Sequence, residues 1–138
     1  MADAAARDVW PDLVGHDAEG AFLIGGRCSA CGHLVLQVRD VCPQCWREGS
    51  MRAAPIGRAA TLYSYTVNHA VPPGFDGPVV LALLDLDEGI RVLAPPEAAP
   101  APPRIGARAE LHLADLCRDR DGKPLRGPRY RLTGDGEV

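Results

Sequence analysis

Long apolar runs, aromatic side chains and an excess of one charge are all scarce in this sequence of 138 residues. No stretch of about 18 apolar residues occurs, so a membrane-spanning helix is not predicted. Aromatic residues make up 5% of the chain, and 15 Lys and Arg against 18 Asp and Glu leave a formal net charge of -3. This balance excludes the general basic field by which proteins attract nucleic acid or anionic lipid.

Signatures of catalysis and of secretion are also missing. The sequence has no glycine-rich phosphate loop, no GxSxG nucleophile elbow, no HExxH helix and no supported pair of carboxylates. Its first twelve residues carry four charges in place of the basic and then apolar pattern of a signal peptide. We therefore predict a cytoplasmic protein that has no catalytic residues of its own.

Turn-forming residues, in contrast, are abundant. The 15 glycines and 13 prolines favour short strands and turns over long helices, while 46% hydrophobic residues predict a folded globular protein. One short helix is expected over residues 4–14, because alanines precede Val9 and Leu13 at helical spacing and Pro11 limits it to a turn or two. The chain is thus predicted to be mainly β.

The strands are predicted from alternating or continuous apolar residues between turn signals. They are expected at residues 21–24, 59–69, 79–86, 90–93, 105–117 and 129–132. Asp87–Gly89 should form a tight hairpin turn, and the proline-rich segment 94–103 is expected to be a surface loop, neither strand nor helix. Five antiparallel strands over residues 53–138 are too few for a typical sandwich. They predict a small closed barrel of the OB type, since closure removes exposed edges.

Four of the five cysteines give the strongest signal in the sequence. Cys28 and Cys31 form one CxxC pair, and Cys42 and Cys45 form a second pair after ten intervening residues. This spacing is typical of two knuckles that converge on one tetrahedral zinc, and four thiolates leave no open position for a catalytic water. We predict a structural zinc that stabilises a segment poor in core-forming residues. Redox and iron–sulfur chemistry remain as alternatives, whereas disulfides are disfavoured without a secretion signal.

Other reactive side chains lack a partner at a recognised spacing. Cys117 lies in a predicted strand and is expected to be a buried thiol. His69 and His112 are expected to be exposed or hydrogen-bonded, whereas His33 follows the first knuckle and could ligate metal only by displacing a cysteine. Three carboxylates are expected to form a solvated turn. A basic run could hold the phosphates of RNA, single-stranded DNA or coenzyme A, although a solvated surface fits it equally well. The carboxylates are Asp85, Asp87 and Glu88, and the basic run consists of Arg118, Arg120, Lys123, Arg126, Arg129 and Arg131.

The order of these motifs resembles that of a known family. The resemblance is carried by the knuckles Gly26–His33 and Val41–Cys45, by Tyr63–Thr66, by Val79–Arg91 and by Ile105–Arg108. The family comprises small proteins with a rubredoxin-like zinc ribbon and a C-terminal OB-fold that accompany thiolase-superfamily enzymes acting on acyl-coenzyme A. It includes the small subunit of benzoylsuccinyl-CoA thiolase and the domain that partners a steroid side-chain aldolase.

The resemblance implies a non-catalytic accessory subunit. Such a subunit would bind and stabilise a thiolase-like catalytic chain, shape the access of acyl-CoA, and hold zinc through the four knuckle cysteines. The expected parts are an N-terminal helical segment with a lead-in strand over residues 1–25, the zinc ribbon over 26–52, and the OB-fold barrel over 53–138.

A stand-alone binding module remains open from the residues alone. An OB barrel can bind single-stranded nucleic acid by stacking bases on exposed aromatics, which here are few: Tyr63, Tyr65, Phe75 and Tyr130. A module for CoA alone would rely on the basic run together with Arg91, Arg104 and Arg108. If the accessory role is correct, exposed apolar side chains should anchor the partner, and the candidates are Trp46, Phe75, Val71 and Leu36.

Overall fold

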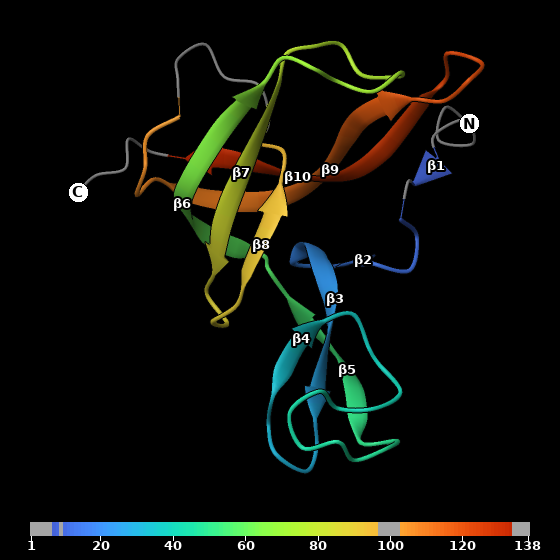
Figure 1. The fold of residues 1–138 in the computed structure, drawn as a ribbon, viewed down its shortest axis with the longest axis vertical. Helices are drawn as coiled ribbons and strands as arrows, with labels where there is room; N and C mark the ends of the chain where they lie inside the picture. The colour runs from blue at the N-terminus through green and yellow to red at the C-terminus, as the bar shows by residue number, and fades with distance from the viewer. Residues whose placement is uncertain (1–6, 9, 97–102, 134–138) are drawn as a thin grey trace.

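The computed structural model describes residues 7–8, 10–96 and 103–133, and every regular element within them is a strand (Figure 1). The strands form two sheets, a barrel at one end of the molecule and a ribbon at the other. The predicted mainly β class is confirmed. The strands are β1 (Arg7–Asp8), β2 (Val14–Asp17), β3 (Gly20–Cys28), β4 (Leu34–Leu36), β5 (Met51–Ile56), β6 (Ala59–Asn68), β7 (Val79–Leu86), β8 (Arg91–Ala94), β9 (Arg108–Arg118) and β10 (Pro124–Thr133).

The six-stranded sheet forms the predicted OB-fold. Its strands follow the order β1-β10-β9-β6-β7-β8, and all neighbours are antiparallel except β1 and β10. Just beyond β8, Pro96 forms a parallel bridge with Tyr130 of β10. The far end of the sheet therefore approaches β10 through one isolated bridge, so the sheet curls into an OB-fold half-barrel and not into the fully closed barrel that was expected.

The four-stranded sheet is organised around β3. β2 and β4 pair with successive parts of β3, while β5 pairs with residues 23–28 of the same strand. β3 therefore runs from beside the barrel down to the first knuckle, as Figure 1 shows. This one strand links the barrel end of the molecule to the metal-binding end.

The hydrophobic core continues from the barrel into the ribbon. Alternate residues of β6 and β7 point inward, and Leu62 and Leu84 are almost completely buried. They belong to the same cluster as Leu23 of β3 and Ile56 of β5. The ribbon and the barrel thus share a core, so neither part is packed independently of the other.

The chain crosses from ribbon to barrel at Gly57, which has a φ of 76°. A Cβ at this position would lie 2.9 Å from Tyr130 Oη and 3.1 Å from Leu23 Cδ1. The Tyr130 hydroxyl donates to the Gly57 carbonyl at 2.7 Å, and Glu88 Oε1 accepts from the Gly57 N–H at 3.0 Å. Because side chains of the barrel bind both polar groups of this residue, the crossing is held in one conformation.

The helix predicted over residues 4–14 is wrong where the structure describes the chain. Arg7 and Asp8 form a strand parallel to β10, residues 11–13 form a turn, and β2 begins at Val14. Residues 1–6 and 9 lie outside the described residues. The helical spacing is a local preference of a very short segment, and pairing with an available sheet edge outweighs it.

The loop predicted over residues 94–103 needs correction at its beginning. Ala94 ends β8, and Pro96 is buried in its bridge to Tyr130. Proline has no N–H to donate, but the carbonyl of Pro95 accepts from the Tyr130 N–H at 3.3 Å. The prolines therefore join the barrel edge as acceptors, while residues 97–102 lie outside the described part.

Candidate metal centre

The two knuckles bring their four cysteines into one group. The sulfurs all lie within 4.8 Å of one another, with 3.7 Å between Cys28 Sγ and Cys45 Sγ and 3.7 Å between Cys31 Sγ and Cys42 Sγ. Four sulfurs bound tetrahedrally to zinc at about 2.3 Å would lie about 3.8 Å apart. A disulfide requires about 2.05 Å between its sulfurs, so the group fits one tetrahedral ion and not two disulfides.

Backbone N–H groups point at the first cysteine of each knuckle. Its sulfur accepts from the N–H groups two and three residues later, at 3.3 and 3.4 Å for Cys28 and at 3.4 and 3.5 Å for Cys42. These donors stabilise a thiolate over a thiol, and the thiolate is the form that binds metal. Both knuckles therefore present one preorganised, buried sulfur.

Each knuckle turns back through a residue in the left-handed backbone region. Gly32 follows Cys31 with a φ of 81°, and Trp46 follows Cys45 with a φ of 65°. The N–H of each donates to the carbonyl of the first cysteine, at 2.9 Å for Gly32 and 2.8 Å for Trp46. The second knuckle thus has a bulky side chain where the first has glycine.

A serine outside the CxxC pairs completes the surroundings of Cys28. Ser50 is 4% exposed, and its hydroxyl lies 3.1 Å from Cys28 Sγ. Together with the N–H of Cys31, this hydrogen bond from Ser50 lowers the pKa of Cys28 to about 5. At neutral pH this cysteine is therefore ready to ligate a cation as the thiolate.

Its neighbour Cys31 titrates in the opposite direction. The N–H of His33 works to lower the pKa of Cys31, but burial and hydrogen bonds to the neighbouring sulfurs raise it to about 12. Sulfurs this close cannot all carry a negative charge unless a cation compensates them. The donor set therefore suits a soft divalent ion such as zinc.

The knuckles enclose only a small apolar cluster of their own. It consists of the buried residues Cys28, Cys42 and Met51, with Val35 packed against them. Burial of so few side chains provides little hydrophobic free energy. As expected from the sequence, the ribbon tip needs another source of stability, which a closed metal site can supply.

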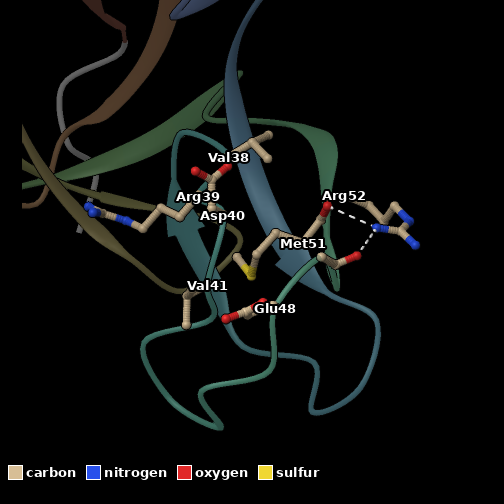
Figure 2. A pocket seen from close by; sticks show the side chains of 8 residues that line it. Val38, Arg39, Asp40, Val41, Glu48, Met51 and Arg52 are labelled. Carbon is tan, nitrogen blue, oxygen red and sulfur yellow. Dashed lines mark hydrogen bonds between the residues drawn. The ribbon is translucent and has the colours of Figure 1, made fainter.

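An open hollow lies at the base of the second knuckle (Figure 2). The antiparallel bridge between Val41 and Glu48 closes the knuckle, and both residues line the hollow. Figure 2 shows Arg52 at one side, where its guanidinium donates to two backbone carbonyls, while Arg39 extends away on the other. The lining also includes Asp40, so it combines both signs of charge and offers no uniform site for a small ion.

Of the three carboxylates predicted to form a solvated turn, Asp87 and Glu88 lie in the exposed turn after β7, whereas Asp85 is half-buried on β7 itself. Arg91 donates to Asp85 at 2.6 Å, and Arg108 donates to Asp87 at 2.9 Å. Hydrogen bonds from these arginines lower the pKa of both carboxyls. General acid catalysis at neutral pH would require a raised carboxyl pKa, so these groups are suited to a structural role.

Other residues singled out in the sequence lie outside the cysteine group. Cys117 is half-buried on β9 rather than fully buried, His33 is half-buried after the first knuckle, and His69 is exposed. Within the basic run, Arg118 pairs with Asp76 of the loop between β6 and β7. Ser50 and the Gly57 crossing belong to no motif of fixed spacing, so the sequence gives no sign of either role.

A ribbon with four grouped cysteines that shares its core with an OB-fold barrel defines the class of this protein. The described residues contain no helix long and apolar enough to cross a membrane. Family models agree with this division of the chain: "ChsH2, rubredoxin-like zinc ribbon domain" matches residues 23–51, and "ChsH2, C-terminal OB-fold domain" matches residues 53–114.

Individual relatives extend the match to most of the chain. The benzoylsuccinyl-CoA thiolase subunit BbsA of Thauera aromatica is 34% identical over 123 residues, which cover 88% of this chain and 85% of BbsA. A DUF35 domain-containing scaffold protein of Methanocaldococcus jannaschii is 30% identical over 77% of both chains. The solved Ltp2-ChsH2(DUF35) aldolase matches with a TM-score of 0.64 and 30% identity, over 80% of this chain and 84% of that one. The chain therefore belongs to the ChsH2 family of zinc-ribbon and OB-fold proteins, as its motif order indicated.

Proposed function

We propose that this protein is a non-catalytic accessory subunit, which binds and stabilises a thiolase-like catalytic chain and shapes the access of its acyl-CoA substrate. The observation that carries the proposal is the 34% identity to BbsA across 88% of the chain, since BbsA is itself named as a subunit of a CoA thiolase. The similarity to the Ltp2-ChsH2(DUF35) aldolase, which covers 80% of this chain, also supports this accessory role. Catalysis would then reside in the partner.

We propose further that one structural zinc is held by Cys28, Cys31, Cys42 and Cys45. The sulfur spacing and the hydrogen bonds to Cys28 and Cys42 support this assignment. Four thiolates close the coordination sphere, so the ion would contribute folding free energy and leave no position for substrate. Its role is to hold the knuckles in the shape that a partner meets.

A stand-alone nucleic-acid module is less well supported by the barrel. Tyr130 is 0% exposed, Tyr65 packs against the core, and Phe75 is half-buried. Tyr63 is exposed, but the guanidinium of Arg91 lies 3.5 Å from the centre of its ring. Base stacking needs free aromatic faces, and these four positions do not provide a continuous platform.

A stand-alone CoA site would also have to break existing ion pairs. Arg91 and Arg108 donate to Asp85 and Asp87, and each arginine would give up a carboxylate to bind phosphate. We therefore propose that acyl-CoA is the substrate of the complex and not a ligand that the isolated chain retains. Equilibrium dialysis of the isolated chain against CoA should show no retention, whereas saturable binding would support the alternative.

The experiment that tests the accessory role is an affinity purification from the organism's own extract. The tagged, zinc-loaded chain is the bait, and the bound proteins are identified by mass spectrometry. Stoichiometric recovery of a thiolase-superfamily protein, with about one zinc per small chain, is the expected result. Recovery of ribosomal proteins or nucleic acid, or of the bait alone, would contradict the proposal.

A further inference from the structure

The second knuckle places its largest side chain in an unfavourable position. Trp46 is 76% exposed and has a φ of 65°. The corresponding residue of the first knuckle is Gly32, which accepts its φ of 81° without steric cost. A bulky L-residue in this region loses backbone energy, and its indole ring also exposes apolar surface to water. In the described part of the isolated chain, no side-chain contact of Trp46 compensates for the left-handed backbone or for the exposed indole ring.

Costs of this kind are typical of residues whose benefit appears only in a complex. Tryptophan is enriched among the few side chains that dominate binding energy at protein interfaces. The other anchors expected from the sequence are less suitable, because Leu36, Val71 and Phe75 are each half-buried in the fold. Trp46 is therefore the candidate that remains available to a partner.

The charges of the ribbon point to the chemistry of that partner. Around the barrel, Arg58, Arg91, Arg108 and Arg118 each donate to an aspartate. The exposed arginines of the ribbon differ, since none has an ion pair anywhere in residues 7–8, 10–96 and 103–133. They are Arg27, Arg39, Arg47 and Arg52. Arg27 and Arg52 lie directly opposite each other on β3 and β5, an arrangement of like charges that is unfavourable without an acidic neighbour.

We propose that Trp46 anchors the ribbon on the thiolase-like catalytic chain, by inserting into an apolar pocket with an acidic rim. We call the exposed side of the ribbon formed by knuckle 42–47 and the hollow at its base the knuckle surface. Trp46 supplies the desolvated centre of the contact. Around it, Arg39, Arg47 and Arg52 outnumber Asp40 and Glu48, so the border of this surface carries a net positive charge that favours encounter with acidic side chains. The inference rests on the proposed function for the identity of the partner, and adds to it the surface that the partner covers.

The test compares three baits in the same extract: the wild-type chain, Trp46→Gly and the control Leu93→Ala. Leu93 is 61% exposed on β8, so the control also removes an exposed apolar side chain, but from the barrel wall. The captured thiolase-like chain is then purified, and its Kd for each variant is measured by biolayer interferometry at low and high salt. Melting temperatures of the free, zinc-loaded variants are recorded in parallel.

For Trp46→Gly we expect the melting temperature to stay the same or rise, because glycine relieves the left-handed backbone, while binding weakens about 30-fold. Leu93→Ala should bind as the wild type does, and high salt should weaken wild-type binding. If all three baits capture the catalytic chain equally, the proposed function stands and the anchor assignment is wrong. An equal loss of binding with Leu93→Ala, or binding of the wild type that does not depend on salt, contradicts the assignment of the knuckle surface to this interface. If the wild type captures no thiolase-like chain, both proposals fail.

Discussion

The hydroxyl of Ser50 has one proton and two acceptors within reach, Cys28 Sγ at 3.1 Å and the carbonyl of Arg47 at 3.4 Å. A metal-bound thiolate can only accept a hydrogen bond, so zinc loading should direct the proton to sulfur. Partners of this kind orient the ligand and increase metal affinity, typically by about 10- to 100-fold.

Ser50→Ala should therefore weaken zinc binding by about tenfold without unfolding the loaded protein. Competition with a chromogenic chelator measures the affinity. Ser29→Ala is the matched control, because Ser29 belongs to the first knuckle and is exposed. Equal affinities for Ser50→Ala and Ser29→Ala would show that the hydroxyl is only a neighbour of the site.

A second single-atom change tests the crossing between ribbon and barrel. Tyr130→Phe removes the donor to the Gly57 carbonyl and leaves that buried acceptor unpaired. We expect a loss of about 1–3 kcal/mol in the free energy of unfolding, measured by urea denaturation of the zinc-loaded protein. Tyr65→Phe is the control, since Tyr65 also packs against the core. A loss no larger than in the control would mean that the hydroxyl does not hold the crossing.

Among the elements, the β7–β8 hairpin is predicted to carry a pH-dependent part of the stability. Hydrogen bonds from Arg91 hold the pKa of Asp85 below its usual value of 3.8. A lowered carboxyl pKa means that the native state favours the ionised form. The pair therefore contributes stability above about pH 3.8 and loses that contribution as the pH falls through the lower, folded-state pKa.

Asp85→Asn should thus be less stable than the wild type at pH 7, and the difference should shrink as the pH falls below 3.8. The measurement is denaturant unfolding of both proteins at a series of pH values from 7 down to about 3, which extends about one unit below 3.8. Zinc release in acid affects both proteins alike and cancels in the difference. Asp121→Asn, which removes a carboxylate from an exposed turn away from Arg91, is measured beside it as the control. A constant difference for Asp85→Asn would remove the ion pair as its cause.

The elements also show what sequence alone could predict. β7 occupies the predicted residues 79–86, because eight mainly apolar residues between turns have few other options. β4 has only three residues, and β5 contains Pro55, so neither has a pattern that stands out. Both exist because β3 offers them an edge, and β5 tolerates its proline at that position. Strands that form only because a neighbouring strand offers an edge cannot be predicted from a short stretch of sequence.

The same distinction applies to the candidate site. The four cysteines were found because knuckles impose a fixed spacing, and the structure groups them within 4.8 Å. Ser50 and Tyr130 act on residues 22 and 73 positions away, and no sequence rule connects such distances. Local chemistry was thus predictable, whereas the contacts that hold it in place required the fold.

For the whole molecule, the shared core predicts that metal removal affects the barrel as well as the ribbon. Leu23 and Ile56 lie on β3 and β5 and belong to the core cluster that contains Leu62. If chelation releases the knuckles, both strands lose their support at one end. We expect a lower melting temperature and faster amide exchange, first in residues 28–50 and then in β3 and β5.

Readdition of zinc after the chelator is removed should restore both signals. Calcium at the same concentration is the control, since it prefers oxygen ligands over thiolates. Unchanged exchange in β3 and β5 after chelation would mean that the barrel end of the core does not depend on the metal centre.

The crossing at Gly57 has a consequence for the thermodynamics of assembly. With its N–H and its carbonyl both bound by side chains, the segment does not act as a hinge. A two-part protein with a flexible joint would have to give up orientational freedom when both parts engage one partner, whereas a rigid one has lost that freedom on folding. The distance between ribbon and barrel is therefore set before the protein meets its partner. Small-angle X-ray scattering of the free chain should then give the same shape that the chain has in a complex.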